Sequence, residues 1–134
     1  MPATRDTLVG NALALKATYT RMNRDILRVV HAIPFGRVTT IEAISRFLDV
    51  PAHHVAFLLS RRYETEREAA PWYRVIAHRG AVGRPQFDAQ GRTQVERLTA
   101  EGVDVGYRGR VGNFATCYFE PTIDSTGVVP STIR

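Results

Sequence analysis

The chain is poor in cysteine. Cys117 is the only cysteine among 134 residues, so an intramolecular disulfide and a cluster of thiolate metal ligands are both excluded. The apolar, aromatic residues 114–119 around it predict a buried, unreactive thiol. The four histidines do not have metal-ligand spacing with a supporting carboxylate; they are His31, His53, His54 and His78. We therefore expect no metal site and no cofactor.

Long apolar runs are also missing. No segment approaches the roughly 20 apolar residues that a membrane-spanning helix needs. The first residues lack the basic and then apolar pattern of a signal peptide. These absences predict a cytoplasmic protein without a membrane partner. With 134 residues, of which 44% are hydrophobic, the chain predicts one domain with a sizeable core.

Lysine is nearly absent, although the chain is basic. The formal net charge is +5, the pI is about 10.0, and Lys16 is the only lysine among 18 basic residues. A basic surface favours a polyanionic partner, and the planar arginine fork suits phosphates and base edges. A compositional bias of the source genome explains the arginine excess equally well, so charge alone does not identify the partner.

Helical periodicity is clearest in the first half of the chain. Apolar side chains from Ile26 to Ile33 fall on one face, Asn23 is a plausible cap, and Pro34-Phe35-Gly36 ends this helix. Thr39 and Glu42 predict a capping box for the next helix. Residues 1–21 are weakly patterned, and a helix is allowed over 13–19.

A further helix is expected from Pro51 to the pair Arg61-Arg62, with Val55, Leu58 and Leu59 facing inward. Two short helices joined by a tight break, the second basic at its end, are typical of a helix-turn-helix. The charged segment 64–68 predicts a solvated loop or a helical extension. Four phenylalanines are expected in the core: Phe35, Phe47, Phe57 and Phe119.

The second half of the chain contains the only tryptophan. Residues 72–77 predict a strand, since Val75 and Ile76 suit a buried sheet and Pro71 fixes the turn before it. A turn over 79–85, a helix over 92–101 ended by Gly102, and a hairpin over 103–111 follow. The tail from Thr122 is rich in Ser, Thr, Pro and Gly and is expected to be mobile.

The order of these motifs resembles the DNA-binding domain of the O6-alkylguanine-DNA alkyltransferase family, over about residues 22–120. The matching stretches are Ile33-Pro34-Phe35-Gly36-Arg37-Val38-Thr39-Thr40, Pro71-Trp72-Tyr73-Arg74-Val75-Ile76, Gly80-Ala81-Val82-Gly83 and Glu101-Gly102-Val103. The resemblance implies a mainly α fold with short strands, a winged helix-turn-helix. It would occupy residues 22–121, between an N-terminal extension (1–21) and the tail (122–134).

In that family the strand opens Pro-Cys-His-Arg-Val, and the cysteine accepts the alkyl group. Here Trp72 stands at the cysteine position and Tyr73 at the histidine position. The alkyltransferase-like sub-family, with Pro-Trp-His-Arg-Val, binds damaged bases without repairing them. An indole is no nucleophile, and a phenol with a pKa of about 10 reacts weakly, so alkyl transfer is not expected. A purine could instead stack on Trp72.

The resemblance also implies site residues. A lesion pocket would comprise Trp72, Tyr73, Arg74, Val75, Gly83, Arg84, Pro85 and Glu101, with Val75 acting through its backbone and Glu101 bonding to Tyr73. DNA-binding residues would be Thr39, Thr40, Ile41, Ala52, His53, His54, Ala56, Arg61 and Arg62. Ile41 replaces the tyrosine that drives base flipping, and His53 or His54 replaces the arginine finger.

These expectations describe a monomeric, non-enzymatic sensor of O6-alkylguanine in duplex DNA. It would bind the minor groove, flip the lesion against Trp72 and mark the site for nucleotide excision repair proteins. Three alternatives stay open: a winged-helix regulator without lesion specificity, an enzyme that uses Tyr73 as acceptor or base, and an interaction module whose DNA binding has decayed. Trp72 as a pure core residue is the corresponding structural alternative.

Overall fold

Helices dominate the computed structural model, which describes residues 5–130, with side chains from residue 10 onward. The order of elements is α1 (Arg5–Ala32), β1 (Thr39–Thr40), α2 (Ile41–Leu48), α3 (Ala52–Leu59), α4 (Thr65–Ala69), the 3-10 helix η1 (Trp72–Arg74), β2 (Val75–Ile76), α5 (Gln94–Ala100), the 3-10 helix η2 (Tyr107–Gly109), α6 (Phe114–Cys117) and α7 (Ile123–Thr126). The expected mainly α class with short strands is confirmed.

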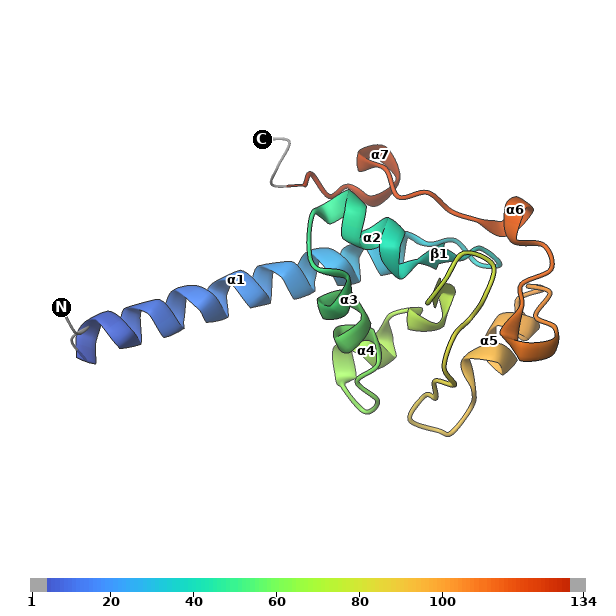
Figure 1. Cartoon of the computed structure of the whole chain (residues 1–134), viewed down its shortest axis with the longest axis horizontal. Helices are drawn as coiled ribbons and strands as arrows, with labels where there is room; N and C mark the ends of the chain where they lie inside the picture. Colours follow the sequence, from blue (N-terminus) through green and yellow to red (C-terminus); the bar gives the residue numbers. More distant parts are fainter. Residues whose placement is uncertain (1–4, 131–134) are drawn as a thin grey trace.

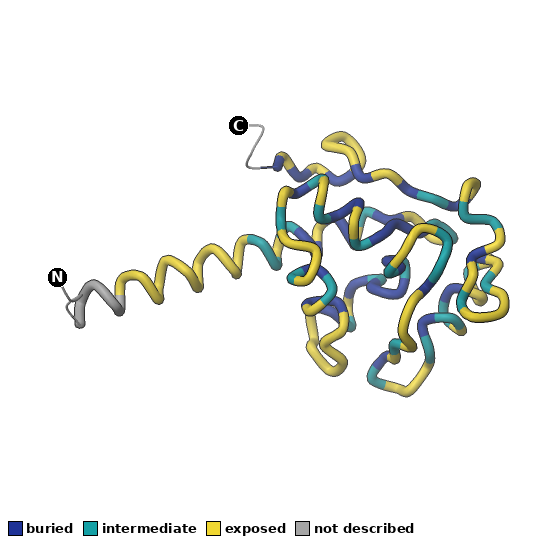
Figure 2. The backbone as a smooth tube through the Cα atoms, in the orientation of Figure 1, coloured by how far each residue is buried: buried dark blue, intermediate teal, exposed yellow. Residues whose placement is uncertain are grey.

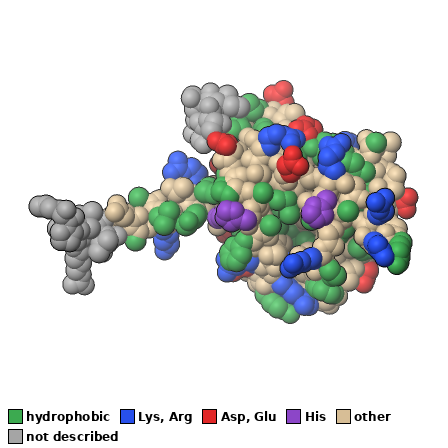
Figure 3. Space-filling model, viewed as in Figure 1, with side chains coloured by type: hydrophobic (Ala, Val, Ile, Leu, Met, Phe, Trp, Pro, Cys, Tyr) green, Lys and Arg blue, Asp and Glu red, His purple; other side chains and the backbone are tan. Residues whose placement is uncertain are grey.

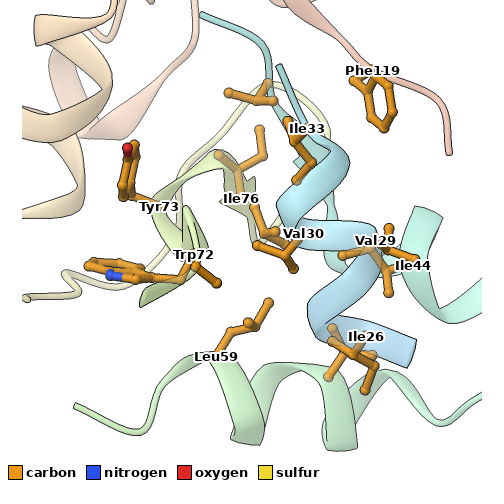
Figure 4. Close-up of a cluster of buried hydrophobic side chains, with 14 of the residues drawn as sticks. Ile26, Val29, Val30, Ile33, Ile44, Leu59, Trp72, Tyr73, Ile76 and Phe119 are labelled. Carbon is orange, nitrogen blue, oxygen red and sulfur yellow. The ribbon is translucent and has the colours of Figure 1, made fainter. Parts of the chain in front are cut away.

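The core forms around the second half of α1. Its apolar face, which includes Ile26, Val30 and Ile33, is almost completely buried and meets Ile44 of α2 and Ile76 of β2 (Figure 4). The first half of α1 projects beyond the body, and every side chain from residue 10 to 21 is exposed (Figures 1 and 2).

The expected cap at Asn23 is wrong, because α1 runs through this residue without a break. The boundary expected between residues 21 and 22 therefore lies inside a helix. The apolar periodicity begins only where the helix meets the core. Residues 1–4 of the expected extension lie outside the described residues.

The helix-turn-helix is formed by α2 and α3, which pack against each other. Thr40 caps α2, because its hydroxyl accepts a hydrogen bond from the Ala43 amide at 3.0 Å. The expected box at Thr39 is thus displaced by one residue, and Glu42 pairs with Arg46 instead. Asp49, with a φ of 55°, ends α2, and Pro51 precedes the first turn of α3 as expected.

The sheet is small and brings distant segments together. β1 and β2 pair in parallel, with Thr39 opposite Val75. The strand expected over 72–77 is wrong in its first half, where residues 72–74 form η1 and the Arg74 amide donates to the Pro71 carbonyl at 3.0 Å. Proline fixes φ at −75° here, so the chain turns before it extends.

The wing follows β2. His78 and Ala81 exchange two backbone hydrogen bonds of 3.1 Å in a tight turn, where Gly80 has a φ of 78°. Isolated antiparallel bridges then join Ala81 to Arg110 and Val105 to Val111. The hairpin expected over 103–111 is therefore present as a short, bridged turn.

The last part of the described chain packs on α1. Val128 is 3% exposed, α7 contacts α1, and Arg28 donates to the Gly127 carbonyl at 3.4 Å. The expectation of a mobile tail is wrong for residues 122–130, because a Thr122–Ser125 capping box orders the turn that buries these side chains. Residues 131–134 lie outside the described residues.

Candidate nucleic-acid interface

The exposed face of α3 carries small and aromatic residues. Ala52 and His53 are exposed, Ala56 is half-buried, and Phe57 is 61% exposed. Val55, Leu58 and Leu59 fill the core side, as expected. Phe57 and Phe35 were expected in the core, and this expectation is wrong because both are exposed. Phe119 is in the core as expected. Small residues allow close approach of a backbone or a minor groove, and the aromatic ring offers a stacking surface.

A cavity of about 440 Å³ lies beside this face. Its volume is within the range of small-molecule pockets. The starts of α2 and α5, the helix α3, and the chain from η1 through β2 to the loop after it supply the lining residues: Ile41, His53, Ala56, Phe57, Leu59, Ser60, Trp72, Val75, Ala77, His78, Val82, Arg84, Gln86 and Gln94. Figure 3 shows a hollowed face of the molecule, where hydrophobic side chains lie among histidine and basic ones.

Trp72 lines this cavity and is also part of the core. Only 2% of the residue is exposed, and its ring lies edge-on to Tyr73 with centroids 5.8 Å apart. Figure 4 shows both rings on the side of the core away from α1. Trp72 is thus a core residue that also lines the cavity, and its role in stacking a base stays a prediction.

Three of the expected pocket residues form a separate polar cluster. Glu101 accepts hydrogen bonds from the Tyr73 hydroxyl at 3.0 Å, from the Gly36 amide at 3.0 Å and from Arg74 at 2.7–3.3 Å. Tyr73, Arg74 and Glu101 do not line the cavity. Burial by itself raises the pKa of Glu101, but these hydrogen bonds outweigh it and hold the pKa below its ordinary value. The cluster joins η1 to the end of α5 and to the turn between α1 and β1.

The loop after the wing turn forms the rim. Gly83, Arg84 and Pro85 are exposed, and only Arg84 of these lines the cavity. Gly83 has a φ of 95°, and a Cβ added there would lie 2.5 Å from the Ala77 Cβ. Glycine is therefore required at this position for both conformation and space.

Gln94 was not expected at the site. It is buried, and its side-chain amide donates to the carbonyls of Tyr73 at 3.1 Å and Val75 at 2.8 Å. The backbone of Val75, which was expected to act in the lesion pocket, thus already has one partner at its carbonyl. Since a carbonyl has two lone pairs, a second donor can still bind there.

The two histidines of α3 have different surroundings. His53 is exposed at the cavity. His54 instead faces α1, where its Nε2 lies 2.7 Å from the Asn23 side-chain oxygen and its ring stacks on Tyr19 with centroids 5.6 Å apart. The structure therefore favours His53 as the side chain in the position of the finger.

Other expected DNA contacts differ in accessibility. Thr39 and Thr40 are buried, so their side chains are not accessible at the surface, and their assignment as DNA-binding residues stays a prediction. Arg61 is exposed and pairs with Glu64 at 2.7 Å, a surface ion pair that phosphate can replace. Arg62 donates to the Asp88 carbonyl at 2.8 Å and lies over Tyr63 and Phe87, so it mainly holds the loop after β2.

The single thiol lies outside the cavity, and the described residues contain no cluster of metal ligands. Cys117 is 4% exposed and does not line the cavity, and burial raises the pKa of its thiol. In the described part of the chain, no group of three or more His, Cys, Asp or Glu side chains is placed to hold a metal ion. Between residues 5 and 130, no helix has the length and apolarity needed to cross a membrane.

The family model for the DNA-binding domain of 6-O-methylguanine DNA methyltransferase matches residues 21–103, from the middle of α1 to the end of α5. The chain belongs to this family. The match includes the helix-turn-helix, the cavity wall and the wing turn. The first half of α1 and the residues from Asp104 onward lie outside the matched segment.

The chain is also similar to an alkyltransferase-like protein and to a DNA base-flipping protein. Alkyltransferase-like protein 1 of Schizosaccharomyces pombe is 29% identical over 82 residues, which are 61% of this chain and 75% of that protein. A DNA base-flipping protein of Vibrio parahaemolyticus is 33% identical over 88 residues, or 64% and 84% of the two chains.

Two solved structures of S. pombe proteins share the fold. Atl1, in complex with damaged DNA containing O6-carboxymethylguanine, matches with a TM-score of 0.62 and 26% identity, over 76% of this chain and 97% of that one. An S. pombe ATL–DNA complex matches with a TM-score of 0.56 and 25% identity, over 79% and 97%. The winged helix-turn-helix expectation for the matched part is thereby supported.

Proposed function

We propose that this protein recognises O6-alkylguanine in duplex DNA without removing the alkyl group. The observation that carries the proposal is that Trp72 lines the cavity beside α3. The resemblance to the alkyltransferase family assigns the acceptor cysteine to this position. Both solved relatives are bound to DNA, one of them to DNA containing O6-carboxymethylguanine.

α3 would enter the minor groove with its small residues foremost. Ala52 and Ala56 allow close approach, and His53 stands where a side chain can fill the gap left by a flipped base. Arg61, at the far end of the same face, would contact phosphate. Binding of this kind is salt-dependent, because each phosphate contact releases counterions.

The flipped base would enter the cavity against Trp72. The lining is mainly apolar, and polar side chains within it, such as that of Arg84, would contact the base. A purine ring stacked on an aromatic side chain gains roughly 1–3 kcal/mol. An alkyl group on the guanine oxygen weakens base pairing, so the lesion costs less to flip than an intact guanine.

Alkyl transfer requires a nucleophile at the cavity. Cys117 is outside it, and the Tyr73 hydroxyl donates to Glu101 rather than pointing to the lining. The protein would instead mark the lesion for nucleotide excision repair proteins in the cytoplasm. Incubation with an O6-methylguanine duplex and intact-protein mass measurement tests the first part. We expect an unchanged mass, and a stable gain of one methyl group would contradict the proposal.

A second candidate is a winged-helix DNA-binding protein without lesion specificity. Ile41 favours it, because this residue lines the cavity where the family uses a flipping tyrosine and cannot donate a hydrogen bond. An equal affinity for alkylated and unmodified duplexes would support this candidate.

A further inference from the structure

Arg67 of α4 is buried as completely as an aliphatic core residue. The residue is 1% exposed, and it is the largest of the fully buried side chains in the described part of the chain. A buried guanidinium is unfavourable unless it is paired and hydrogen-bonded, so such a residue needs a structural or functional reason. Desolvation lowers the pKa of Arg67, and the neighbouring Glu68 opposes this shift.

The contacts of Arg67 join the parts that surround the cavity. Its Nε donates to the carbonyl of Leu59, the last residue of α3, at 2.9 Å. Its Nη1 donates to the Phe87 carbonyl at 3.0 Å and pairs with Glu68. Arg67 thereby connects the end of α3 with Phe87, whose neighbour Gln86 lines the cavity.

The guanidinium also stacks on Trp72. Its central carbon is 3.5 Å from the centroid of the Trp72 ring, closer than in any other cation–aromatic pair of the described residues. Tryptophan is the best aromatic partner for a cation. Nη2 is buried without a hydrogen-bond partner among the described residues. The guanidinium therefore lies over the ring with one of its donors unsatisfied.

We propose that Arg67 is a positioning residue for lesion recognition, one that fixes the plane of Trp72 as the cavity wall and couples this wall to α3. It covers one face of the indole from behind and does not line the cavity itself. A Trp72 ring that is already held in place loses little conformational entropy when a base stacks on it. Binding of a flipped lesion therefore becomes more favourable, and selectivity over a plain duplex improves. This inference rests on the proposed function.

Trp72 makes the inference measurable, because it is the only tryptophan and its fluorescence reports on this ring alone. Arg67→Met keeps a long side chain but removes the stacked cation. We expect its Trp72 emission to shift to the red and acrylamide quenching to rise. The ratio of affinities for an O6-methylguanine duplex and a matched plain duplex should fall about tenfold, with plain-duplex affinity nearly unchanged.

Arg37→Met is the matched control. Arg37 also donates to two backbone carbonyls, those of Cys117 at 3.0 Å and Tyr118 at 2.6 Å, but it has no contact with Trp72. We expect this variant to lose stability and to keep both the Trp72 emission and the affinity ratio. If the ratio of affinities for the two duplexes falls equally in both variants, Arg67 has only a general structural role.

A double-mutant cycle tests whether Arg67 acts through Trp72. In a Trp72→Ala background, Arg67→Met should lower the affinity ratio no further. A full additional loss there, or an unchanged ratio in the single variant, would overturn the inference. If Arg67→Met does not fold, Arg67→Lys, which keeps the charge and loses the planar stack, carries the same test. A wild-type protein without lesion preference would instead contradict the proposed function.

Discussion

Glu101→Gln is the substitution for which the structure gives the clearest expectation. The carboxylate accepts hydrogen bonds from Arg74, Tyr73 and the Gly36 amide, and the side chains of Glu101 and Arg74 are only 7% and 14% exposed. Glutamine keeps the shape but removes the charge and one acceptor oxygen. It leaves the Arg74 guanidinium without its counter-charge.

Breaking a buried ion pair by changing one partner costs about 3–5 kcal/mol. Some exposure remains, so we expect the lower end, about 3 kcal/mol, and a melting temperature lower by roughly 10 °C. Glu42→Gln is the control, because Glu42 pairs with Arg46 at similar distance but both side chains are more than half exposed. It should cost less than about 0.5 kcal/mol. Urea and thermal unfolding followed by circular dichroism measure both.

The pH dependence provides an independent check. The pKa of Glu101 is lowered in the folded state, so its contribution is present above the ordinary value of 4.5 and is lost as the pH falls through the folded value. The difference between wild type and Glu101→Gln should therefore shrink between about pH 7 and about pH 3. A difference below about 1 kcal/mol at neutral pH, or one that does not change with pH, would refute the reasoning.

Other substitutions separate the wall, the rim and the phosphate contact. Trp72→Ala should lower affinity for an O6-methylguanine duplex about tenfold more than for a plain duplex, measured by fluorescence anisotropy of labelled DNA; an equal fall would make Trp72 structural only. Gly83→Ala should lower the free energy of unfolding in urea by about 3 kcal/mol or more, because it combines a left-handed φ with a clash against Ala77. Gly80→Ala is the control: its added Cβ meets no atom within 4 Å, so it should cost about 1 kcal/mol. Equal losses would contradict the steric argument. Arg61→Ala should weaken both duplexes alike and lower the slope of log affinity against log salt by about 1; a loss confined to the lesion duplex would show that Arg61 serves the cavity.

The helices of the helix-turn-helix were predictable because their signals are local. The inward residues Val55, Leu58 and Leu59 follow helical spacing, and Pro51 marks the start of α3. The errors at the boundaries have local causes as well. Thr39 and Thr40 are adjacent hydroxyl residues and both belong to β1, but Thr40 directly precedes α2, so its hydroxyl is the one that caps the helix.

The cavity was only partly predictable. Of the pocket residues that the resemblance implies, only Trp72, Val75 and Arg84 line it. Ile41, His53 and Ala56, which were expected to contact DNA, line it as well. Gln86 and Gln94 come from a segment without a recognisable motif, and only the folded chain places them beside α3. Arg67 lies in a charged stretch, and such a stretch predicts a solvated segment. The sequence alone does not indicate that the Leu59 carbonyl and the Trp72 indole will surround this guanidinium.

The tail shows the limit of composition as a guide. Ser, Thr, Pro and Gly are frequent in mobile segments, and residues 122–130 contain them. Here Thr122 and Ser125 cap a short helix, and Val128 is buried beneath. A few apolar residues among polar ones are enough to fix a segment when a complementary surface, in this protein α1, is close.

The central claim is lesion recognition, and the affinity for two paired duplexes tests it most directly. The duplexes have the same sequence and differ only in one guanine, which carries an O6-methyl group in one of them. The account predicts tighter binding of the alkylated duplex, by about tenfold or more at physiological salt, with no gain in protein mass. Equal affinity for the two duplexes would contradict it and would favour a DNA-binding protein without lesion specificity.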